Sequence, residues 1–328
     1  MRIVVTGGAG FIGSALCRML VAERGATVLN LDKLTATSSL ASLTAIAQSP
    51  RYSFRRIDVC DRERVAALLH AFAPDAVIHA AAERLPHARH GSAPAAVETN
   101  VLGTWRLLEA ARDYWSVLPT KRQEAFRFLS VSMAGGQITP EAASRAGADE
   151  LVLAWHKSYG LPAIISKGPA TFGPYQFPVE PIPALVTAAC DGEPITPKAG
   201  DPARWLYVED HVRALLAMFD KGTPGATYSP AGSGLVAPEA VATRVFELAA
   251  RHGGRPGSLT GPASRGRLVV AEEPCAGILA QDTGWRAEET AETALSKTVR
   301  WYLANEVWWR PLAAAQAADN RFGLLKIA

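Results

Sequence analysis

The first half of the chain alternates between short apolar runs and longer stretches in which apolar residues recur every three or four positions. The first pattern is typical of buried strands and the second of amphipathic helices. The runs predict strands at residues 2–6, 27–31, 52–57, 76–80, 126–131 and 163–166, and helices at residues 11–23, 62–71, 94–115 and 140–158. Strands that alternate with helices pack into a parallel sheet covered on both faces, so we expect an α/β fold with a doubly wound sheet.

The composition changes after Lys167, where proline, glycine and tryptophan become frequent. This change predicts a smaller, mixed and loop-rich second lobe. A strand-like run at 205–208 leads into a helix that begins near Glu209, so we expect this part of the chain to return to the first lobe. The predicted division is a first domain of residues 1–167 with 204–222, and a second lobe of residues 168–203 and 223–328. Ligands of such sheets bind at the carboxyl ends of the strands, where we expect the second lobe to help hold a substrate.

Four aromatic residues near the end of the sequence, Trp301, Tyr302, Trp308 and Trp309, follow a helical spacing. We expect them on one amphipathic helix. Large aromatic side chains bury much apolar area, so packing in a core or in a dimer contact is their simplest role.

Charge and cysteine content exclude several classes of protein. The 328 residues include 34 lysines and arginines and 31 aspartates and glutamates, mixed along the chain, so we expect no surface for nucleic acid or for an anionic membrane. The four cysteines are scattered singly, which favours neither a disulfide framework nor a metal site and fits a reducing cytoplasm. No apolar run approaches the roughly 18 residues of a membrane span, and we expect no targeting segment.

A glycine-rich segment, Thr6-Gly7-Gly8-Ala9-Gly10-Phe11-Ile12-Gly13, lies between the first predicted strand and the first predicted helix. In this context three of the glycines have a structural reason. Gly7 permits a tight turn, Gly10 lets the backbone approach a pyrophosphate, and Gly13 allows close packing of the helix. The amino end of the helix stabilises the negative charge, so the segment predicts a dinucleotide site of Rossmann type.

Asp32 closes the second predicted strand, about 20 residues after the glycines, where a carboxylate accepts hydrogen bonds from both hydroxyls of an adenosine ribose. We therefore expect NAD rather than NADP. Lys33 follows directly and could tolerate a 2′-phosphate, which leaves the alternative open. Asp58 and Val59 end the third strand, where they would border the adenine ring unless Asp58 is only a solvated surface carboxylate.

Further segments resemble one known family. They are Leu31-Asp32-Lys33-Leu34-Thr35, Val77-Ile78-His79-Ala80-Ala81-Ala82-Glu83, Glu98-Thr99-Asn100-Val101-Leu102-Gly103-Thr104, Phe172-Gly173-Pro174-Tyr175-Gln176-Phe177-Pro178, Trp205-Leu206-Tyr207-Val208-Glu209-Asp210-His211 and Thr298-Val299-Arg300-Trp301-Tyr302-Leu303-Ala304-Asn305. With the glycine segment, they resemble the dTDP-glucose 4,6-dehydratases, extended short-chain dehydrogenases of the NAD-dependent epimerase/dehydratase type. The resemblance covers nearly the whole chain. It implies bound NAD, a nucleoside-diphosphate sugar, above all a dTDP-hexose, and a homodimer formed through the long helices.

The resemblance also implies residues of the binding sites. The further implied cofactor residues are Phe11, Ile12, Thr35, Ala80, Ala81, Ala82, Thr99 and Arg145, and the implied substrate residues are Glu83, His87, Tyr175 and Arg204. The family's Arg-Asp-Trp-Leu reads Ala203-Arg204-Trp205-Leu206 in this chain, so Arg204 would meet a phosphate from a displaced position.

The catalytic motifs of the family are missing. Its chemistry needs a Tyr-x-x-x-Lys pair, in which the phenolate takes a proton from the sugar C4 hydroxyl, but no tyrosine of this chain has a lysine four residues later. Glu141 stands at the tyrosine position and Arg145 at the lysine position. The family's Ser-Thr-Asp-Glu segment, which carries out the elimination of water, reads Ser132-Met133-Ala134-Gly135.

The replacements offer few acids and bases. Glu141 could act as a base, but Arg145 lies four residues later on the same helix, and a cation at that distance lowers a carboxylate pKa. We therefore favour an ion pair between them. Ser132 remains from the family motif. His87, in a cluster with His90, Arg84 and Arg89, is a candidate acid or base or a solvated side chain.

Two hypotheses fit this sequence. The first is an enzyme that acts on a nucleotide sugar through a rewired site, by epimerisation, isomerisation or an atypical dehydration. The second is a catalytically inactive paralogue that acts as a binding or partner subunit. In both cases we expect no ordinary 4,6-dehydration, because removing one positioned acid or base typically lowers a rate by about 10²- to 10⁴-fold.

Overall fold

The chain divides into two compact units, each of which is described by itself below. The computed structural model describes residues 1–83, 93–134, 139–195, 200–232, 234–260, 268–271 and 277–324. Unit 1 comprises Met1–Pro169, Glu209–Pro230 and Ala276–Arg286, and unit 2 comprises Ala170–Val208, Ala231–Cys275 and Ala287–Ala328. This grouping differs from the division expected from the sequence, because the run at 205–208 falls in unit 2 and a late segment joins unit 1.

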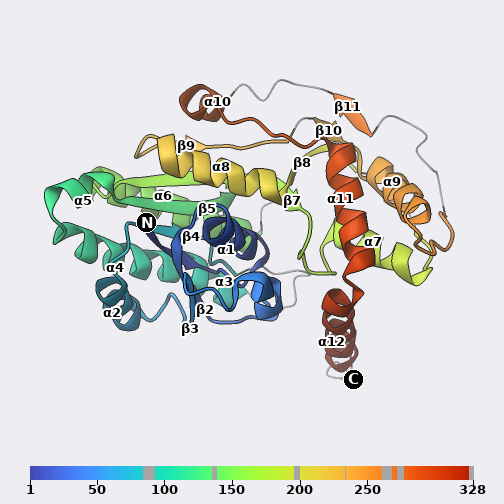
Figure 1. Cartoon of the computed structure of the whole chain (residues 1–328), viewed down its shortest axis with the longest axis horizontal. Helices are drawn as coiled ribbons and strands as arrows, with labels where there is room; N and C mark the ends of the chain where they lie inside the picture. Colours follow the sequence, from blue (N-terminus) through green and yellow to red (C-terminus); the bar gives the residue numbers. More distant parts are fainter. Residues whose placement is uncertain are drawn as a thin grey trace. The chain divides into compact units, whose positions relative to one another are not determined.

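Unit 1 is built on a parallel sheet (Figure 1). Its described strands are β1 (Arg2–Thr6), β2 (Thr27–Asp32), β3 (Tyr52–Arg56), β4 (Ala76–His79), β5 (Arg127–Met133), β6 (Ala163–Gly168) and β9 (Thr227–Tyr228). Among the described residues these seven strands follow the order β3-β2-β1-β4-β5-β6-β9, and every neighbouring pair is parallel. The chain runs outward from β1 to β3 and then resumes at β4 on the other side of β1. The expected doubly wound sheet is thereby confirmed, with its switch point between β1 and β4.

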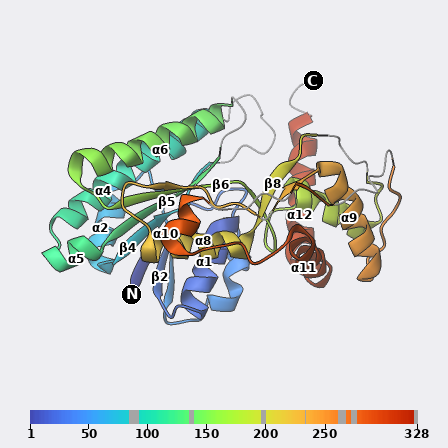
Figure 2. The same cartoon turned by 90° about the horizontal axis from the view of Figure 1, so that it is seen from above.

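Helices cover both faces of this sheet. They are α1 (Phe11–Ala22), the 3-10 helix η1 (Leu40–Ile46), α2 (Arg62–Phe72), α3 (Ala93–Ala96), the π-helix η2 (Val97–Gly103), α4 (Thr104–Ser116), α5 (Thr120–Ala125), α6 (Pro140–Tyr159), α8 (Val208–Lys221) and α10 (Ile278–Thr283). On one face Val4, Val77 and Phe128 belong to a buried apolar cluster with residues of α2, α4 and α6. Figure 2 shows α1 and α8 on the opposite face.

The helix expected at 94–115 is present but irregular. It consists of α3, η2 and α4 in direct succession, so one turn in its middle is wider than an α-helix. Hydrophobic spacing alone did not reveal this turn. Such π-turns inside helices are frequent at functional sites, because the extra residue redirects the side chains around it.

Unit 2 has a smaller mixed sheet, as expected. Its described strands are β7 (Ala170–Phe172), β8 (Ala203–Tyr207), β10 (Leu235–Val236) and β11 (Val269–Ala271), in the order β11-β10-β8-β7. Only β7 and β8 pair in parallel among these described strands. The helices of this unit are α7 (Pro181–Asp191), α9 (Pro238–Arg251), α11 (Ala291–Ala304) and α12 (Glu306–Leu324). Val186, Val245 and Val299 join α7, α9 and α11 in one buried core.

The aromatic residues near the C-terminus do not share one helix, which corrects the expectation. Trp301 and Tyr302 lie on α11, whereas Trp308 and Trp309 lie on α12, and the chain turns at Asn305 between them. The backbone of Asn305 has φ −126° and ψ 38°, which is not helical. The packing role is nevertheless observed for Tyr302 and Trp309, which are buried, and the Trp309 indole donates to the carbonyl oxygen of Tyr302 at 2.9 Å.

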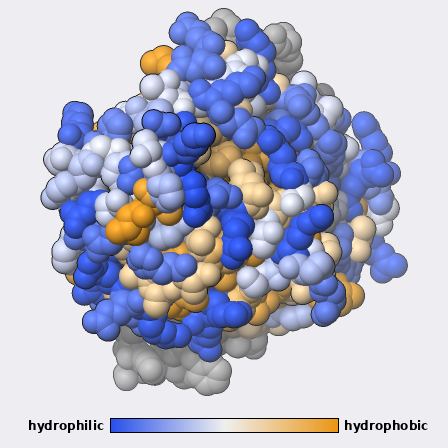
Figure 3. Space-filling view, turned by 60° about the vertical axis from the view of Figure 1, so that its left-hand side comes forward, coloured by the Kyte–Doolittle hydropathy of each residue, from blue (hydrophilic) through white to orange (hydrophobic). Residues whose placement is uncertain are grey.

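The outer surface of the protein is mixed in polarity. Figure 3 shows hydrophilic residues over much of the visible face, interspersed with smaller hydrophobic groups. None of the helices within the described ranges is long and apolar enough to cross a membrane.

Candidate functional site

A pocket of about 480 Å³ opens at the carboxyl ends of β1, β2 and β4 in unit 1. This is the switch point of the sheet, where open α/β sheets bind ligands. The pocket is lined by Gly7, Gly10, Asp32, Lys33, Thr35, Asp58, Val59, Ala80, Ala81, Ala82, Glu83 and Thr99, whereas Phe11, Ile12 and Gly13 form the first turn of α1. The structure therefore brings together most residues that the sequence predicts for cofactor binding.

The glycine turn at the pocket has no room for larger residues. Gly7 has φ +72°, a conformation that favours glycine, and a Cβ atom on it would lie 2.6 Å from the backbone of Ala81. A Cβ atom on Gly13 would lie 2.1 Å from the carbonyl oxygen of Gly7. Gly10 precedes α1, whose first N–H groups lack acceptors within the helix. The turn is therefore shaped to receive a pyrophosphate group.

Asp32 is held rigidly at the end of β2. Its buried carboxylate accepts hydrogen bonds from the backbone N–H of Ala9 at 3.0 Å and from that of Leu34 at 2.8 Å. These bonds leave further lone pairs of the carboxylate for a ligand in the pocket. A fixed acceptor beside the glycine turn fits the two hydroxyl groups of an adenosine ribose.

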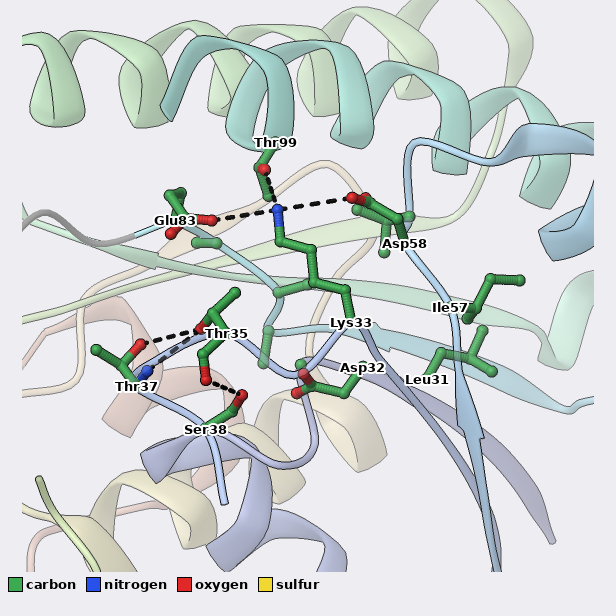
Figure 4. A pocket seen from close by; sticks show the side chains of 16 residues that line it. Leu31, Asp32, Lys33, Thr35, Thr37, Ser38, Ile57, Asp58, Glu83 and Thr99 are labelled. Atoms are coloured by element: carbon green, nitrogen blue, oxygen red, sulfur yellow. Dashed lines mark hydrogen bonds and ion pairs between the residues drawn. The ribbon is translucent and has the colours of Figure 1, made fainter. Parts of the chain in front are cut away.

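Lys33 is surrounded by acceptors, as Figure 4 shows. Its ammonium group lies 3.2 Å from the carboxylate of Glu83 and 3.6 Å from that of Asp58, and it donates to the hydroxyl of Thr99 at 2.8 Å. Partial burial opposes the charge, but Asp58 and Glu83 outweigh burial and raise the pKa of Lys33. Because two carboxylates neutralise this cation, the geometry favours NAD over a cofactor with a 2′-phosphate.

A second, polar pocket of about 270 Å³ adjoins the first, and both are lined by Ala81 and Ala82. The polar residues that line it are His79, Asn100, Thr104, Ser130, Ser132, Arg145 and Asp149. It thus contains Ser132 and Arg145, two of the candidate catalytic residues. We refer to it as the polar pocket.

Glu141 and Arg145 form the ion pair that their spacing predicts. Both lie in the first half of α6, and Arg145 Nε donates to Glu141 Oε1 at 3.2 Å. The two side chains are largely shielded, with 12% of Arg145 and 22% of Glu141 exposed. Glu141 is not among the residues that line the polar pocket. The ion pair thus holds Glu141 against Arg145, outside the lining of the polar pocket.

A second charged pair was not recognised in the sequence. Asp149 of α6 accepts a hydrogen bond from Ser132 Oγ at 3.1 Å, and its same oxygen lies 3.1 Å from Lys167 Nζ of β6. A signal was available, because Glu141, Arg145 and Asp149 follow at intervals of four residues and share one face of a helix. The contact of Lys167 could not be predicted from sequence spacing, since Asp149 and Ser132 are 18 and 35 residues away from it.

His79 is buried between two hydroxyl groups at the base of the polar pocket. Its Nδ1 lies 2.7 Å from Thr6 Oγ1, and its Nε2 lies 2.9 Å from Thr104 Oγ1. Burial, with a smaller effect of the Arg145 charge, lowers the pKa of His79 to about 4. The ring is therefore neutral at physiological pH and serves to join β1, β4 and α4.

The π-turn η2 supplies one side chain to each pocket. Thr99 binds Lys33 in the first pocket. The side chain of Asn100 accepts from the backbone N–H of Glu83 at 2.7 Å and donates to Ser144 Oγ at 2.9 Å beside the polar pocket. Neighbouring side chains of this π-turn, Thr99 and Asn100, thus contribute to the two pockets.

Several predicted residues lie elsewhere. His87 and its neighbours Arg84, Arg89 and His90, together with Gly135, lie outside the described residues. In unit 2, the Tyr175 ring lies 4.5 Å from that of Trp301, and Arg204 donates to the carbonyl oxygen of Gly232 at 3.5 Å. The described part of the chain contains no cluster of three or more histidine, cysteine, aspartate or glutamate side chains arranged for a metal ion.

Comparison with known proteins gives a consistent picture. Residues 3–229 match the family described as the NAD dependent epimerase/dehydratase family. A dTDP-glucose 4,6-dehydratase of Neisseria meningitidis serogroup B is 39% identical, over 98% of this chain and 99% of that protein. The crystal structure of a dTDP-glucose 4,6-dehydratase from Bacillus anthracis in complex with NAD has a TM-score of 0.77 and 29% identity, over 95% of this chain and 99% of that one. The crystal structure of a UDP-glucose 4-epimerase of Thermus thermophilus in complex with NAD has a TM-score of 0.72 and 25% identity. The match covers 93% of this chain and 100% of that one.

Proposed function

Because this chain belongs to the NAD dependent epimerase/dehydratase family, we propose that it is an enzyme that modifies a nucleoside-diphosphate hexose, above all a dTDP-hexose, through a rewired active site. The reaction is an epimerisation, an isomerisation or an atypical dehydration, and not ordinary 4,6-dehydration. One observation carries this proposal: the pocket at the glycine turn adjoins a polar pocket whose lining includes His79, Ser132, Arg145 and Asp149 and no tyrosine.

The cofactor is NAD, and the residues of the first pocket fit it. The glycine turn would hold the pyrophosphate, Asp32 would accept from the adenosine ribose, and Asp58 and Val59 would border the adenine. When bound, NAD accepts and returns a hydride. The protein supplies a site that fixes the dinucleotide and an adjoining polar pocket for the reacting group.

The resemblance implies that this chain lacks the side chains that ordinary dehydration requires. A glutamate paired with Arg145 replaces the tyrosine, and Met133, Ala134 and Gly135 replace the Thr, Asp and Glu of the elimination step. Each missing acid or base lowers the rate by about 10²- to 10⁴-fold. Hydride transfer from the carbon of a hydroxyl group also releases the hydroxyl proton, so it needs another proton acceptor in this site, whereas the elimination of water lacks three further side chains.

A second candidate function is that of a catalytically inactive binding or partner subunit. The specific observation in its favour is charge compensation around the polar pocket, where Glu141 pairs with Arg145 and Asp149 pairs with Lys167. Such a subunit would bind the nucleotide sugar without turning it over.

We also propose a cytoplasmic homodimer. Val97, Leu102 and Trp105 of η2 and α4 expose 47%, 40% and 41% of their surface, which supports an interface along these helices. Cys17, Cys60 and Cys190, the cysteines within the described ranges, are unpaired, which supports a reducing compartment. The mass of the purified protein in solution tests the dimer.

The function is tested by incubating the purified protein with NAD and either dTDP-glucose or UDP-glucose and identifying the products by nuclear magnetic resonance. We expect an isomer of the nucleotide sugar and no 4-keto-6-deoxy product at an ordinary enzyme rate. Formation of that product at such a rate would contradict the proposal. Tight binding of the sugar nucleotide without any change in it would favour the binding subunit.

A further inference from the structure

Lys167 and Ser132 are neighbours across two strands at the carboxyl edge of the sheet in unit 1. Residue 132 of β5 is the register partner of residue 167 of β6. Both side chains point to the face covered by α6, because both contact Asp149 of that helix. Lys167 is not itself among the residues that line the polar pocket, but Ser132 and Asp149, its two neighbours in this cluster, both line it at the edge of the sheet where ligands bind.

Asp149 fixes both groups through one oxygen atom. Its Oδ2 lies 3.1 Å from Ser132 Oγ and 3.1 Å from Lys167 Nζ. The side chain of Asp149 is only 6% exposed, whereas that of Lys167 is 36% exposed. The carboxylate therefore lies inside the protein, and Lys167 is the more accessible member of the pair.

This difference in exposure separates the roles of the two charges. A buried carboxylate needs donors, and Ser132 and Lys167 provide them. An ammonium group has three N–H donors, and Asp149 is its one ion-pair partner within the described ranges. Because the ion pair already restricts the lysine side chain, binding an oxygen with a further N–H loses little conformational freedom.

We propose that Lys167 is a ligand-contacting residue of the rewired site, where its ammonium group binds a hydroxyl or keto oxygen of the hexose. This inference rests on the proposed function, because it takes the ligand to be a nucleotide sugar. A fixed cation at this edge stabilises negative charge that develops on that oxygen. Asp149 acts as a positioning residue, and Ser132 offers a second polar group in the adjoining polar pocket.

The test separates the sugar from the nucleotide. The affinities of the wild-type protein for dTDP, dTDP-glucose and NADH are measured by titration calorimetry and compared with those of Lys167→Met. We expect the variant to keep its affinity for dTDP and NADH and to lose about tenfold or more in affinity for dTDP-glucose, the loss of one charge-assisted hydrogen bond. Lys167→Arg, which keeps the charge, should recover part of this affinity.

Two further variants secure the interpretation. Lys167→Met leaves the Asp149 charge without its ion pair and could impair folding, so the double variant Lys167→Met/Asp149→Asn removes both charges together. It should show the same selective loss for dTDP-glucose. Lys157→Met, an exposed lysine near the end of the same helix as Asp149, is the matched control and should bind all three ligands like the wild type.

The outcomes distinguish this inference from the proposed function. If the ratio of the affinities for dTDP-glucose and dTDP is the same in the wild type and in both Lys167→Met variants, Lys167 does not contact the hexose, while the proposed function stands. If the wild type binds neither dTDP-glucose nor UDP-glucose, the proposed function and this inference fall together.

Discussion

The two pockets on either side of Ala81 and Ala82 are built in different ways. The cofactor pocket depends on backbone geometry, since Gly7 has φ +72° and Gly13 leaves no space for a Cβ atom. The polar pocket depends on side chains, and the charges around it are compensated by pairing, as Lys167 with Asp149 shows. A rigid backbone site and a site made of exchangeable side chains thus lie next to each other in one unit.

This difference predicts that the two sites respond differently to substitution. Any side chain at Gly13 meets backbone atoms, so no compensating change nearby can accommodate it. An ion pair can be exchanged as a unit, because its two groups, such as Glu141 and Arg145, satisfy each other. The chemistry of the second pocket can therefore change while the fold and the cofactor site persist.

The largest effect is expected for Gly13→Ala. The added Cβ atom would lie 2.1 Å from the carbonyl oxygen of Gly7, so the turn between β1 and α1 has to open. We expect a loss of about 3 kcal/mol in the free energy of unfolding, the upper end for an inserted carbon atom, and no measurable NADH binding. Urea unfolding and NADH fluorescence measure the two effects.

Gly147→Ala is the matched control for this substitution. A Cβ atom on Gly147, within α6, would meet its nearest atom at 3.9 Å, which is an ordinary contact. Alanine in a helix is favoured over glycine by up to about 1 kcal/mol, so this variant should be as stable as the wild type or more so. If Gly13→Ala bound NADH like Gly147→Ala, the rigid description of the cofactor turn would be wrong.

A smaller effect, dependent on pH, is expected for His79. Its pKa is lowered from 6.5 to about 4, mainly by burial and secondarily by Arg145. Between these two values the unfolded chain binds a proton that the folded protein does not bind, so stability falls as the pH falls from about 7 to about 4. The loss due to this residue is about 3 kcal/mol. His211, with a pKa lowered to about 4 by burial, acts in the same direction.

His79→Gln isolates the contribution of His79. Its free energy of unfolding, measured in urea at several pH values, should fall less steeply with acid than that of the wild type, by about 3 kcal/mol in total. His70→Gln, on the exposed side of α2, should keep the wild-type pH dependence. Parallel curves for the wild type and His79→Gln would show that the ring is not kept neutral in the folded protein.

The fold and the cofactor pocket could be predicted from the sequence because their signals are local. The glycine segment, Asp32 and the alternation of strands and helices each lie within a short stretch. The pocket around Asp32 and Lys33 then forms at the switch point that any doubly wound sheet has. Even so, the sequence left the role of Lys33 open, because its partners Asp58 and Glu83 are 25 and 50 residues away.

The polar pocket could be predicted only in part, since its contacts join distant segments. The pair of Glu141 and Arg145 was recognised because it lies within one helical turn. The contact of Lys167 with Asp149 depends on the packing of α6 over β6, and no spacing along the chain indicates it. Likewise, the break at Asn305 separates two helices that hydrophobic spacing alone joins into one.

The smallest effect is expected for Glu141→Gln, which tests whether Glu141 acts as a proton acceptor. Exposed pairs of this spacing contribute about 0.3–0.5 kcal/mol, and the shielding of the pair with Arg145 brings its contribution to about 1 kcal/mol. Glu306→Gln, which removes a more exposed pair of the same spacing with Arg310 at the start of α12, is the control. We expect both variants to lose at most about 1 kcal/mol in urea unfolding and to bind NADH and dTDP-glucose like the wild type. If Glu141→Gln alone abolished turnover of a nucleotide sugar while remaining folded, Glu141 would be the proton acceptor, although it is not among the residues that line the polar pocket.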